Sequence, residues 1–404
     1  MFYFGIDWSH DFHVLCILNE AGARLSRSRF AHSLTGFQQV ESERRKLDVP
    51  AAECLVGIET AHNLLVDFLL DHEYSLYVIP PRATDGYRNR QRLSGAYDDD
   101  SDAALLAGIV RTDRGSHRRL LPPSPLVQQL RGQVRLIESL RQTIHRQSQQ
   151  LLAALERCYP QALGLFGDLT AQISLRFLMA YPTAQAAQAL SREDFAAFCH
   201  AQGYTRTDLI PRRYAHLTAP APHASPAVAQ AYQPHIRLWA EFLLPEVQAR
   251  QQALAELDRL FSQHPDAFIF ASLPGCGDLL GPALLAKFGD QRERFAQPRE
   301  VQALAGTCPV TERSGKKKFI HFRYACDKEF RRIAQHFALA SLSQATWASA
   351  YWQAVRPRCA SDSHALRCLA NRWLAIIWTL WQTRQAYDEA YHLRQRARRS
   401  QPKS

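Results

Sequence analysis

The chain has 404 residues, of which 46% are hydrophobic and 22% charged, a balance typical of a soluble protein with two or three domains. Its 49 lysines and arginines against 38 acidic residues give a net charge of +11, which favours an anionic partner such as nucleic acid, although an ordinary basic enzyme can carry the same charge. The nine cysteines include no CxxC pair, which indicates reduced thiols in a cytoplasm rather than disulfides or a zinc site. No signal-peptide pattern opens the chain and no apolar run of 18 residues occurs, so we expect no membrane partner.

The first 80 residues predict a mixed α/β layer. Apolar runs at 3–6, 12–18 and 25–31 are expected strands, the first ending at Asp7. A helix follows with Thr35 as its expected N-cap, then a strand at 54–58 that ends before Glu59, a helix at 64–70 and a strand at 75–79. Three strands followed by helix–strand–helix–strand is the order of an α/β fold.

The middle of the chain predicts a pair of long helices. After a proline-rich linker at 122–125, apolar residues spaced by three and four run from Val127 to Leu155. A second helical stretch covers 236–261, where Pro245 could introduce a bend, and residues 160–225 between them look like small helices with a Pro/Ala-rich loop. Such a hairpin could pack on itself or form a coiled-coil dimer, and the pattern does not separate the two.

The last third predicts a compact, mainly helical region with a basic tail. It contains Gly-rich turns, a lysine run and helices whose tryptophans we expect mostly in a core. We therefore expect four parts, at 1–120, 121–262, 263–391 and 392–404.

Four acidic residues form a candidate metal site. Asp7 and Glu59 each end a predicted strand, and Asp99 and Asp102 are three apart, so they share one face of the predicted helix at 98–110. Converging carboxylates need a cation, and hard oxygen ligands select Mg²⁺ or Mn²⁺. Two such ions can clamp a scissile phosphate. Taken singly, each residue could equally be an ordinary acid at a strand end or a helix start.

Three segments resemble the acidic motifs of the DEDD transposases, the recombinases of the one-ten group of bacterial insertion sequences, which are related to the Piv DNA invertases. They are Phe4-Gly5-Ile6-Asp7, Gly57-Ile58-Glu59-Thr60 and Asp99-Asp100-Ser101-Asp102-Ala103. The last third is similar to the C-terminal transposase domain of the same family, through Leu273-Pro274-Gly275-Cys276-Gly277, Leu304-Ala305-Gly306-Thr307-Cys308-Pro309 and Arg313-Ser314-Gly315-Lys316. Both halves match in order, and the combination is more specific than any single motif.

The resemblance implies a ribonuclease-H-like first domain, similar to the RuvC Holliday-junction resolvase, that holds Mg²⁺ through Asp7, Glu59, Asp99 and Asp102. It implies that Ser314 is the nucleophile, which forms a phosphoserine link to DNA. It further implies DNA and a structured noncoding RNA as partners, a homo-oligomer such as a tetramer of dimers, and a place in the bacterial cytoplasm at the nucleoid. A cation-rich neighbourhood of Arg313, Lys316, Lys317 and Lys318 would stabilise the attacked phosphate, although the same residues could form a polar turn that only binds the DNA backbone.

Gly275 and Gly277 are further candidates for DNA binding. They lie in a Pro-Gly-x-Gly turn between the segment 268–271 and a predicted helix at 279–287, which resembles a helix-hairpin-helix. Glycines there would let backbone N–H groups approach phosphates at a helix start. A plain tight turn explains the pattern as well. The sixteen histidines show no metal-ligand spacing, so we assign none to metal.

These observations leave three functions to separate. The first is a transposase that uses Ser314. The second is a resolvase-like, metal-dependent nuclease that needs the four carboxylates but attacks with water. The third is a non-catalytic nucleic-acid-binding protein, which would tolerate Asp7→Asn and Glu59→Gln.

Overall fold

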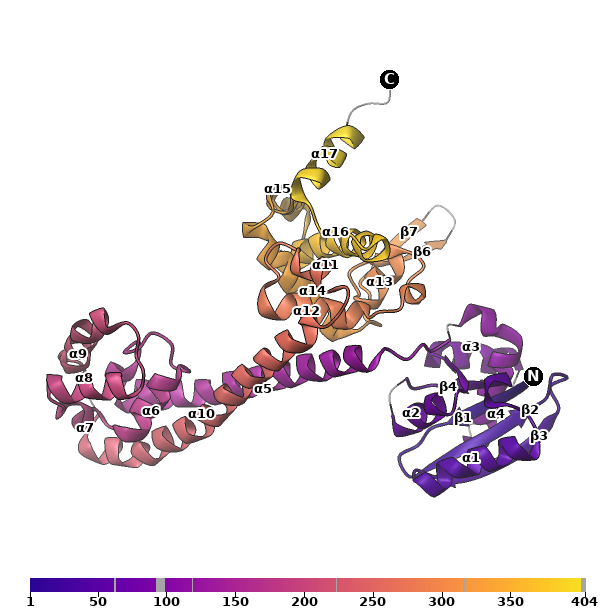
Figure 1. Ribbon diagram of the computed structural model, residues 1–404, viewed down its shortest axis with the longest axis horizontal. Helices are drawn as coiled ribbons and strands as arrows, with labels where there is room; N and C mark the ends of the chain where they lie inside the picture. The colour runs from indigo at the N-terminus through magenta and orange to yellow at the C-terminus, as the bar shows by residue number, and fades with distance from the viewer. Residues whose placement is uncertain (62, 92–98, 118, 223, 315–316, 401–404) are drawn as a thin grey trace. The chain divides into compact units, whose positions relative to one another are not determined.

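The computed structural model describes residues 1–61, 63–91, 99–117, 119–222, 224–314 and 317–400. The chain divides into two compact units, Met1–Pro122 and Pro123–Ser404, at the predicted proline-rich linker (Figure 1). Within the described residues, no helix combines the length and the hydropathy that crossing a bilayer needs.

The first unit is built on a five-stranded sheet in the order β3-β2-β1-β4-β5. The first three strands form an antiparallel meander, whereas β1, β4 and β5 run parallel to one another. The strands are β1 (Phe2–Asp7), β2 (Phe12–Leu18), β3 (Arg24–Ala31), β4 (Cys54–Ile58) and β5 (Ser75–Val78). The predicted α/β layer is therefore confirmed.

Helices cover both faces of this sheet, and the strand sequences reflect it. Alternate residues of β1 point to opposite faces, with Phe4 and Ile6 in one core and Tyr3 in the other. Burial on both faces explains why the strands are continuous apolar runs. The face of Phe4 is covered by α1 (Leu34–Lys46) and α2 (Leu64–Asp71), and the face of Tyr3 by α3 (Pro81–Gln91) and α4 (Asp99–Asp113).

The N-cap of α1 differs from the prediction. Ser33, and not Thr35, caps the helix, because its hydroxyl accepts a hydrogen bond from the Gly36 N–H at 3.1 Å while its own backbone is extended. A cap accepts from the N–H two or three residues ahead, and both Ser33 and Thr35 fit that rule in sequence alone.

Two long helices of the second unit link two hydrophobic cores. They are α5 (Pro125–Cys158) and α10 (Pro226–Ser262), and they pack side by side (Figure 1). Leu130 of α5 and Leu257 of α10 belong to one core, whereas Leu151 of α5 and Ala240 of α10 belong to the other. The two helices therefore run antiparallel, as the predicted hairpin requires.

Helix α10 begins ten residues earlier than the apolar pattern indicated. Pro226 occupies its first turn, where a missing N–H costs nothing, and Ser225 precedes it as the N-cap. Both Pro234 and Pro245 lie inside the helix, which continues through them. The end of the predicted Pro/Ala-rich loop is thus the start of the helix.

Small helices, predicted for residues 160–225, complete the core that contains Leu151 and Ala240. These helices are α6 (Gln172–Ala180), α7 (Ala184–Gln188), α8 (Arg192–Ala201) and α9 (Ile210–Thr218). Short 3₁₀ turns connect elements at Ala51–Glu53, Arg114–Ser116, Pro160–Ala162, Thr207–Leu209, Arg292–Arg294, Ser341–Ser343 and Arg356–Arg358.

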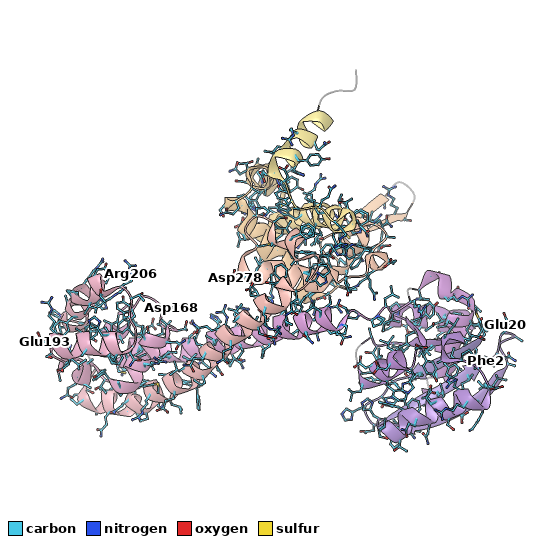
Figure 2. The ribbon with its side chains drawn as sticks, in the orientation of Figure 1. Phe2, Glu20, Asp168, Glu193, Arg206 and Asp278 are labelled. Atoms are coloured by element: carbon cyan, nitrogen blue, oxygen red, sulfur yellow. The ribbon has the colours of Figure 1, made fainter. Side chains whose placement is uncertain are left out.

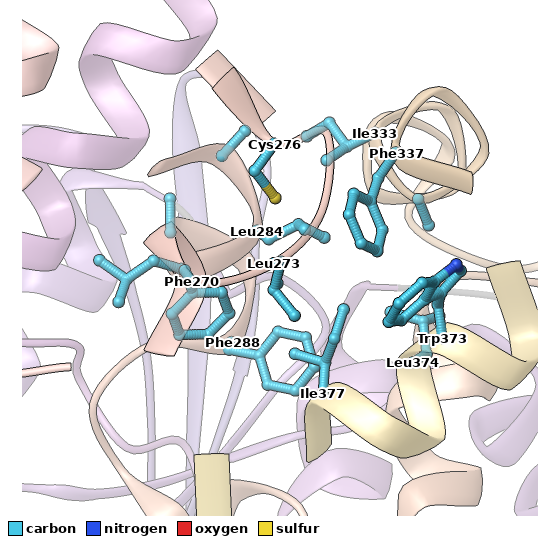
Figure 3. Packing of buried hydrophobic residues seen from close by; sticks show 14 of the residues in the cluster. Phe270, Leu273, Cys276, Leu284, Phe288, Ile333, Phe337, Trp373, Leu374 and Ile377 are labelled. Atoms are coloured by element: carbon cyan, nitrogen blue, oxygen red, sulfur yellow. The ribbon is translucent and has the colours of Figure 1, made fainter. Parts of the chain in front are cut away.

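The C-terminal region packs around the core that contains Leu130 and Leu257. Figure 3 shows part of it, with Phe270 and Phe288 on one side of Leu273 and Leu284, and Phe337 and Trp373 of later helices on the other. The elements are α11 (Ala267–Ala271), α12 (Gly277–Phe288), α13 (Pro298–Leu304), β6 (Val310–Ser314), β7 (Lys317–His321), α14 (Lys328–Ala340), α15 (Thr346–Val355), α16 (Asp362–Thr383) and α17 (Glu389–Ser400). The start of the predicted basic tail is helical, since α17 extends to Ser400; residues 401–404 lie outside the described part.

Candidate active site

Asp7 and Glu59 lie at the ends of two neighbouring parallel strands. β1 and β4 are in register from Phe2 opposite Cys54 to Ile6 opposite Ile58, so the next residue is Asp7, the end of β1, on one side and Glu59, directly after β4, on the other. Because side chains alternate along a strand, Asp7 shares the face of Tyr3 and Gly5, and Glu59 shares the face of Gly57. Both therefore belong to the face that α4 covers.

Helix α4 approaches this face closely because two glycines leave room for it. A Cβ atom on Gly5 would lie 1.9 Å from the Ala103 carbonyl oxygen, and one on Gly57 would lie 2.7 Å from that of Leu106. Any side chain at either position would therefore push the helix away. The sequence motifs Phe4-Gly5-Ile6-Asp7 and Gly57-Ile58-Glu59 thus combine a helix-packing position with an acid two residues later.

The same helix carries the other two candidate acids at its first turn. Asp99 is the first residue of α4, although its side chain lies outside the described residues. Asp102 follows three residues later and is half-buried. The strand ends and the start of α4 together form what we call the acidic edge, namely Asp7, Glu59, Asp99 and Asp102.

Helix α3 contributes two contacts to the acidic edge that sequence reasoning missed. The Thr84 hydroxyl donates a hydrogen bond to Glu59 Oε1 at 3.2 Å, and Arg88 Nη2 lies 2.6 Å from Asp102 Oδ1. Thr84 and Arg88 are four residues apart, so they share one face of the helix. Polar residues spaced by four after Pro80-Pro81 were the only sequence signal for them.

The acidic edge suits a hard cation by ligand type. Carboxylate oxygens are the ligands that Mg²⁺ and Mn²⁺ prefer. The described side chains of Asp7, Glu59 and Asp102 do not bring their oxygens all within 4.8 Å of one another. Among the described residues, the trio that does so with its ligand atoms is Cys359, His364 and Cys368. At the acidic edge, the positive charge beside Asp102 comes from the Arg88 guanidinium.

Ser314 ends the first strand of a two-stranded hairpin in the second unit. It is the last residue of β6 and stands in register with Lys317, the first residue of β7. Both are exposed, as are Arg313 and the apolar side chains of Phe319 and Ile320. An exposed serine at a hairpin tip is accessible to a large substrate such as a nucleic-acid strand.

Two described cations accompany this serine, from Arg313 beside it and Lys317 opposite it. Lys318 lies in register with Arg313, but its side chain is outside the described residues, and so is the whole of Lys316. Lys317 stands opposite Ser314 and so shares its face of the hairpin, where a phosphate that contacts Ser314 would meet this positive charge. Arg313, one residue earlier on β6, belongs to the other face.

The two glycines of the Gly275–Gly277 turn differ in how much space surrounds them. Both have positive φ, +78° and +51°, which favours glycine. A Cβ on Gly275 would lie 2.7 Å from the Ala340 carbonyl oxygen at the end of α14, whereas one on Gly277 would meet nothing within 4 Å. Gly275 therefore packs against protein, and Gly277 alone has open space at the start of α12. The exposed Asp278 beside it adds a negative charge (Figure 2).

Two family models match this chain. One, described as a transposase of the IS110 DEDD type, matches residues 4–160, which include all four acids of the acidic edge. The other, described as the transposase IS116/IS110/IS902 family, matches residues 267–353, which include the glycine turn and the Ser314 hairpin.

Curated relatives extend the similarity over nearly the whole chain. The chain is 30% identical over 392 residues to the mini-circle putative transposase for IS117 of Streptomyces coelicolor, covering 95% of each. It is 29% identical to putative transposase y4uE of Sinorhizobium fredii, over 56% of this chain and 69% of that protein. It is 23% identical to an uncharacterised 42 kDa protein of insertion element IS900 of Mycobacterium paratuberculosis, over 96% and 97%.

Proposed function

Because the chain belongs to the IS116/IS110/IS902 family of transposases, we propose that it recombines the DNA of its insertion sequence by attack of Ser314 at a metal site on the acidic edge. The observation that supports this most is the pairing of β1 with β4, which sets Asp7 and Glu59 at neighbouring strand ends under the helix that begins with Asp99 and Asp102. That arrangement favours a ribonuclease-H-like fold for the first unit.

The four carboxylates of the acidic edge would hold Mg²⁺ or Mn²⁺. A bound cation would neutralise charge on the scissile phosphate and orient it. Asp7 and Glu59 would supply ligands from the sheet, and Asp99 and Asp102 from α4. Arg88 must then release Asp102 or share it, since a carboxylate that binds an arginine at 2.6 Å has less charge to offer a metal.

The proposed reaction has two balanced steps. In the first, the Ser314 hydroxyl loses its proton, its oxygen bonds to phosphorus, and a deoxyribose oxygen leaves and gains a proton. In the second, a deoxyribose hydroxyl of another DNA end attacks the phosphoserine and frees Ser314. One phosphodiester is broken and one is made, so no ATP is needed. Lys317 would stabilise the charge on the attacked phosphate from the same face of the hairpin, and Arg313 would bind the DNA backbone from the other face.

The chemistry requires Ser314 and the acidic edge to act on the same phosphodiester. They belong to different units, and it is the family resemblance that implies a shared role for both in this reaction. We further propose, from the family resemblance, that a structured noncoding RNA pairs with the DNA and that the chain acts as an oligomer. A basic protein can bind the nucleic-acid backbone and its shape, while base pairing between RNA and DNA supplies the sequence specificity.

Carboxyl-to-amide substitutions test the metal site. Asp7→Asn and Glu59→Gln preserve shape and remove charge, so Mg²⁺-dependent cleavage of the element ends should fall by at least about a hundredfold, the effect of losing one strongly stabilising group. Asp67→Asn is the matched control, because Asp67 is exposed on α2, which covers the other face of the sheet. Full cleavage by Asp7→Asn would contradict the proposed metal site.

A further inference from the structure

Two cysteines and a histidine come together at the start of helix α16. His364 and Cys368 are four residues apart on this helix, so they share one face. Cys359 lies in the loop between the 3₁₀ turn Arg356–Arg358 and the N-cap Ser361. The ligand atoms of all three side chains lie within 4.8 Å of one another, and all three residues are half-buried.

The local backbone explains why the loop cysteine meets the helix. The Cys359 N–H donates to the Arg356 carbonyl at 3.1 Å, which closes the 3₁₀ turn, and Arg356 Nη1 donates back to the Cys359 carbonyl at 3.2 Å. The Ser361 hydroxyl then caps α16 by accepting from the His364 N–H at 3.2 Å. These bonds hold the loop against the first turn of the helix.

We propose that Cys359, His364 and Cys368 bind one zinc ion, with a water molecule in the fourth position. Zinc takes thiolate and imidazole ligands in tetrahedral geometry, which places neighbouring ligand atoms about 3.6–3.8 Å apart. The ligand atoms of the three side chains, all within 4.8 Å of one another, are therefore at most about 1.2 Å farther apart than zinc requires. Binding replaces the protons of the two thiols, which are released to solvent, while the histidine binds through a neutral nitrogen. Mg²⁺ is excluded, because soft sulfur ligands disfavour it.

The zinc site has a consequence for the Ser314 hairpin. Arg367 precedes the zinc ligand Cys368, and its guanidinium lies over the ring of Phe322 at 4.6 Å. Arg331 lies over the same ring at 4.5 Å. Phe322 directly follows β7, so these two arginines hold the base of the hairpin whose tip is Ser314. A metal that fixes the first turns of α16 would therefore fix this base as well.

The competing state is a disulfide between Cys359 and Cys368. Both are free thiols here, as are the other seven cysteines. A disulfide would use both sulfurs and leave His364 without a role, whereas a zinc ion would use all three side chains. The two states are also distinguishable in solution, because a reductant prevents the disulfide and leaves the thiols available to metal.

Metal replacement in the full-length, reduced protein tests the proposal. The protein would be stripped of metal, kept in a phosphine reductant and titrated with Co²⁺ and then Zn²⁺. We expect one Co²⁺ per chain with thiolate-to-cobalt charge-transfer absorption, which Zn²⁺ abolishes by displacement. Carboxylates at the acidic edge cannot produce this absorption, so the result is independent of the proposed catalytic metal.

Substitutions locate the site. Cys359→Ser and Cys368→Ser should weaken Co²⁺ binding by more than the roughly 10–100-fold typical of losing an outer-shell partner. Cys326→Ser is the matched control, since Cys326 is also half-buried in this unit but outside the trio, and it should bind Co²⁺ as the parent chain does. The proposal is overturned if the reduced parent chain shows no charge-transfer absorption, or if all variants bind Co²⁺ equally. The first outcome needs no variant, so a variant that fails to fold cannot obscure it.

Discussion

Gly5 and Gly57 lie opposite each other on β1 and β4, and helix α4 packs directly over both. Gly5→Ala would place a methyl group 1.9 Å from the Ala103 carbonyl oxygen, so α4 must shift. Overpacking of this kind costs about 1–3 kcal/mol or more. Since α4 carries Asp99 and Asp102, we expect Gly5→Ala to lower both the free energy of unfolding and the rate of DNA cleavage.

The control for that substitution is Gly132→Ala. Gly132 is exposed in α5, and a Cβ there meets nothing within 4 Å. In a helix interior, alanine is favoured over glycine by roughly 0.5–1 kcal/mol. Gly132→Ala should therefore be neutral or stabilising in urea unfolding and leave cleavage unchanged. Wild-type cleavage by Gly5→Ala would show that the position of α4 does not matter for the reaction.

The Arg88–Asp102 ion pair should compete with metal binding. Its side chains are 15% and 29% exposed, so water screens the pair only in part. Arg88→Gln removes a positive charge beside the proposed ligand, and we expect the dissociation constant for Mg²⁺ to fall. Isothermal titration of the DNA-free protein measures it, with Mn²⁺ as a second probe.

Asp85→Asn provides the comparison for the Arg88 experiment. Asp85 is another partner of Arg88, at 2.9 Å, and it is largely exposed. Its loss leaves the Arg88–Asp102 contact in place, so Mg²⁺ affinity should not increase. Weaker Mg²⁺ binding by Arg88→Gln would mean that the arginine organises the acidic edge rather than competing for it.

The buried His13 should make the first unit sensitive to acid. Burial, reinforced by the nearby His32 at 2.9 Å, lowers the pKa of His13 to about 4. The unfolded chain binds this proton near pH 6.5 and the folded chain only near 4, so stability is complete above pH 6.5 and declines as the pH falls toward 4. Each pKa unit corresponds to about 1.4 kcal/mol.

Urea unfolding followed by circular dichroism at pH 7 and pH 4.5 measures this effect. Replacing the titrating ring in His13→Gln should reduce the difference in midpoint between the two pH values, even if it lowers stability at both. The exposed His200→Gln should leave the difference as it is in the parent chain. An unchanged pH dependence in His13→Gln would rule out this histidine as its source.

Glu138 joins the hairpin helix α5 to α14 of the C-terminal region. It lies 3.0 Å from Arg332 Nη1, and a hydrogen bond from Arg141 is the main reason that its pKa falls to about 2. Because its folded pKa is below the unfolded value of 4.5, its contribution is present above pH 4.5 and is lost as the pH falls toward 2.

Glu138→Gln should therefore cost about 1.5–3 kcal/mol at neutral pH, the range for hydrogen bonds to charged groups, and less near pH 3. Glu241→Gln is the matched control, because its pair with Arg237 is largely exposed and should contribute about 0–1 kcal/mol. Equal losses for the two variants in urea unfolding at pH 7 would contradict the specific role of Glu138.

Much of the fold could be predicted from the sequence, because its signals are local. β1, β4 and the start of α4 follow from apolar runs and acidic boundaries, and parallel pairing then makes neighbours of Asp7 and Glu59. The start of α10 was missed because Pro234 interrupts the sequence just before Ile236, although Val228 and Tyr232 continue the apolar spacing and pack against the core.

The contacts between elements could not be predicted in the same way. Neither Arg88 with Asp102 nor Thr84 with Glu59 follows from spacing, since each pair depends on how α3 packs against the sheet and α4. The sequence analysis did not identify Cys359, His364 and Cys368 as a cluster for a related reason. Their spacing is not a common zinc pattern, and only the 3₁₀ turn before α16 brings the first cysteine back to the helix.

The most direct test of the proposed recombination is a search for the covalent protein–DNA adduct. Full-length protein, Mg²⁺, the noncoding RNA of its element and end-labelled element DNA would be mixed and separated on a denaturing gel. The account predicts label on the protein that Ser314→Ala and Asp7→Asn both abolish, while Asp67→Asn retains it. Cleaved DNA without an adduct, at an equal rate in Ser314→Ala, would contradict the serine mechanism and identify a nuclease that attacks with water.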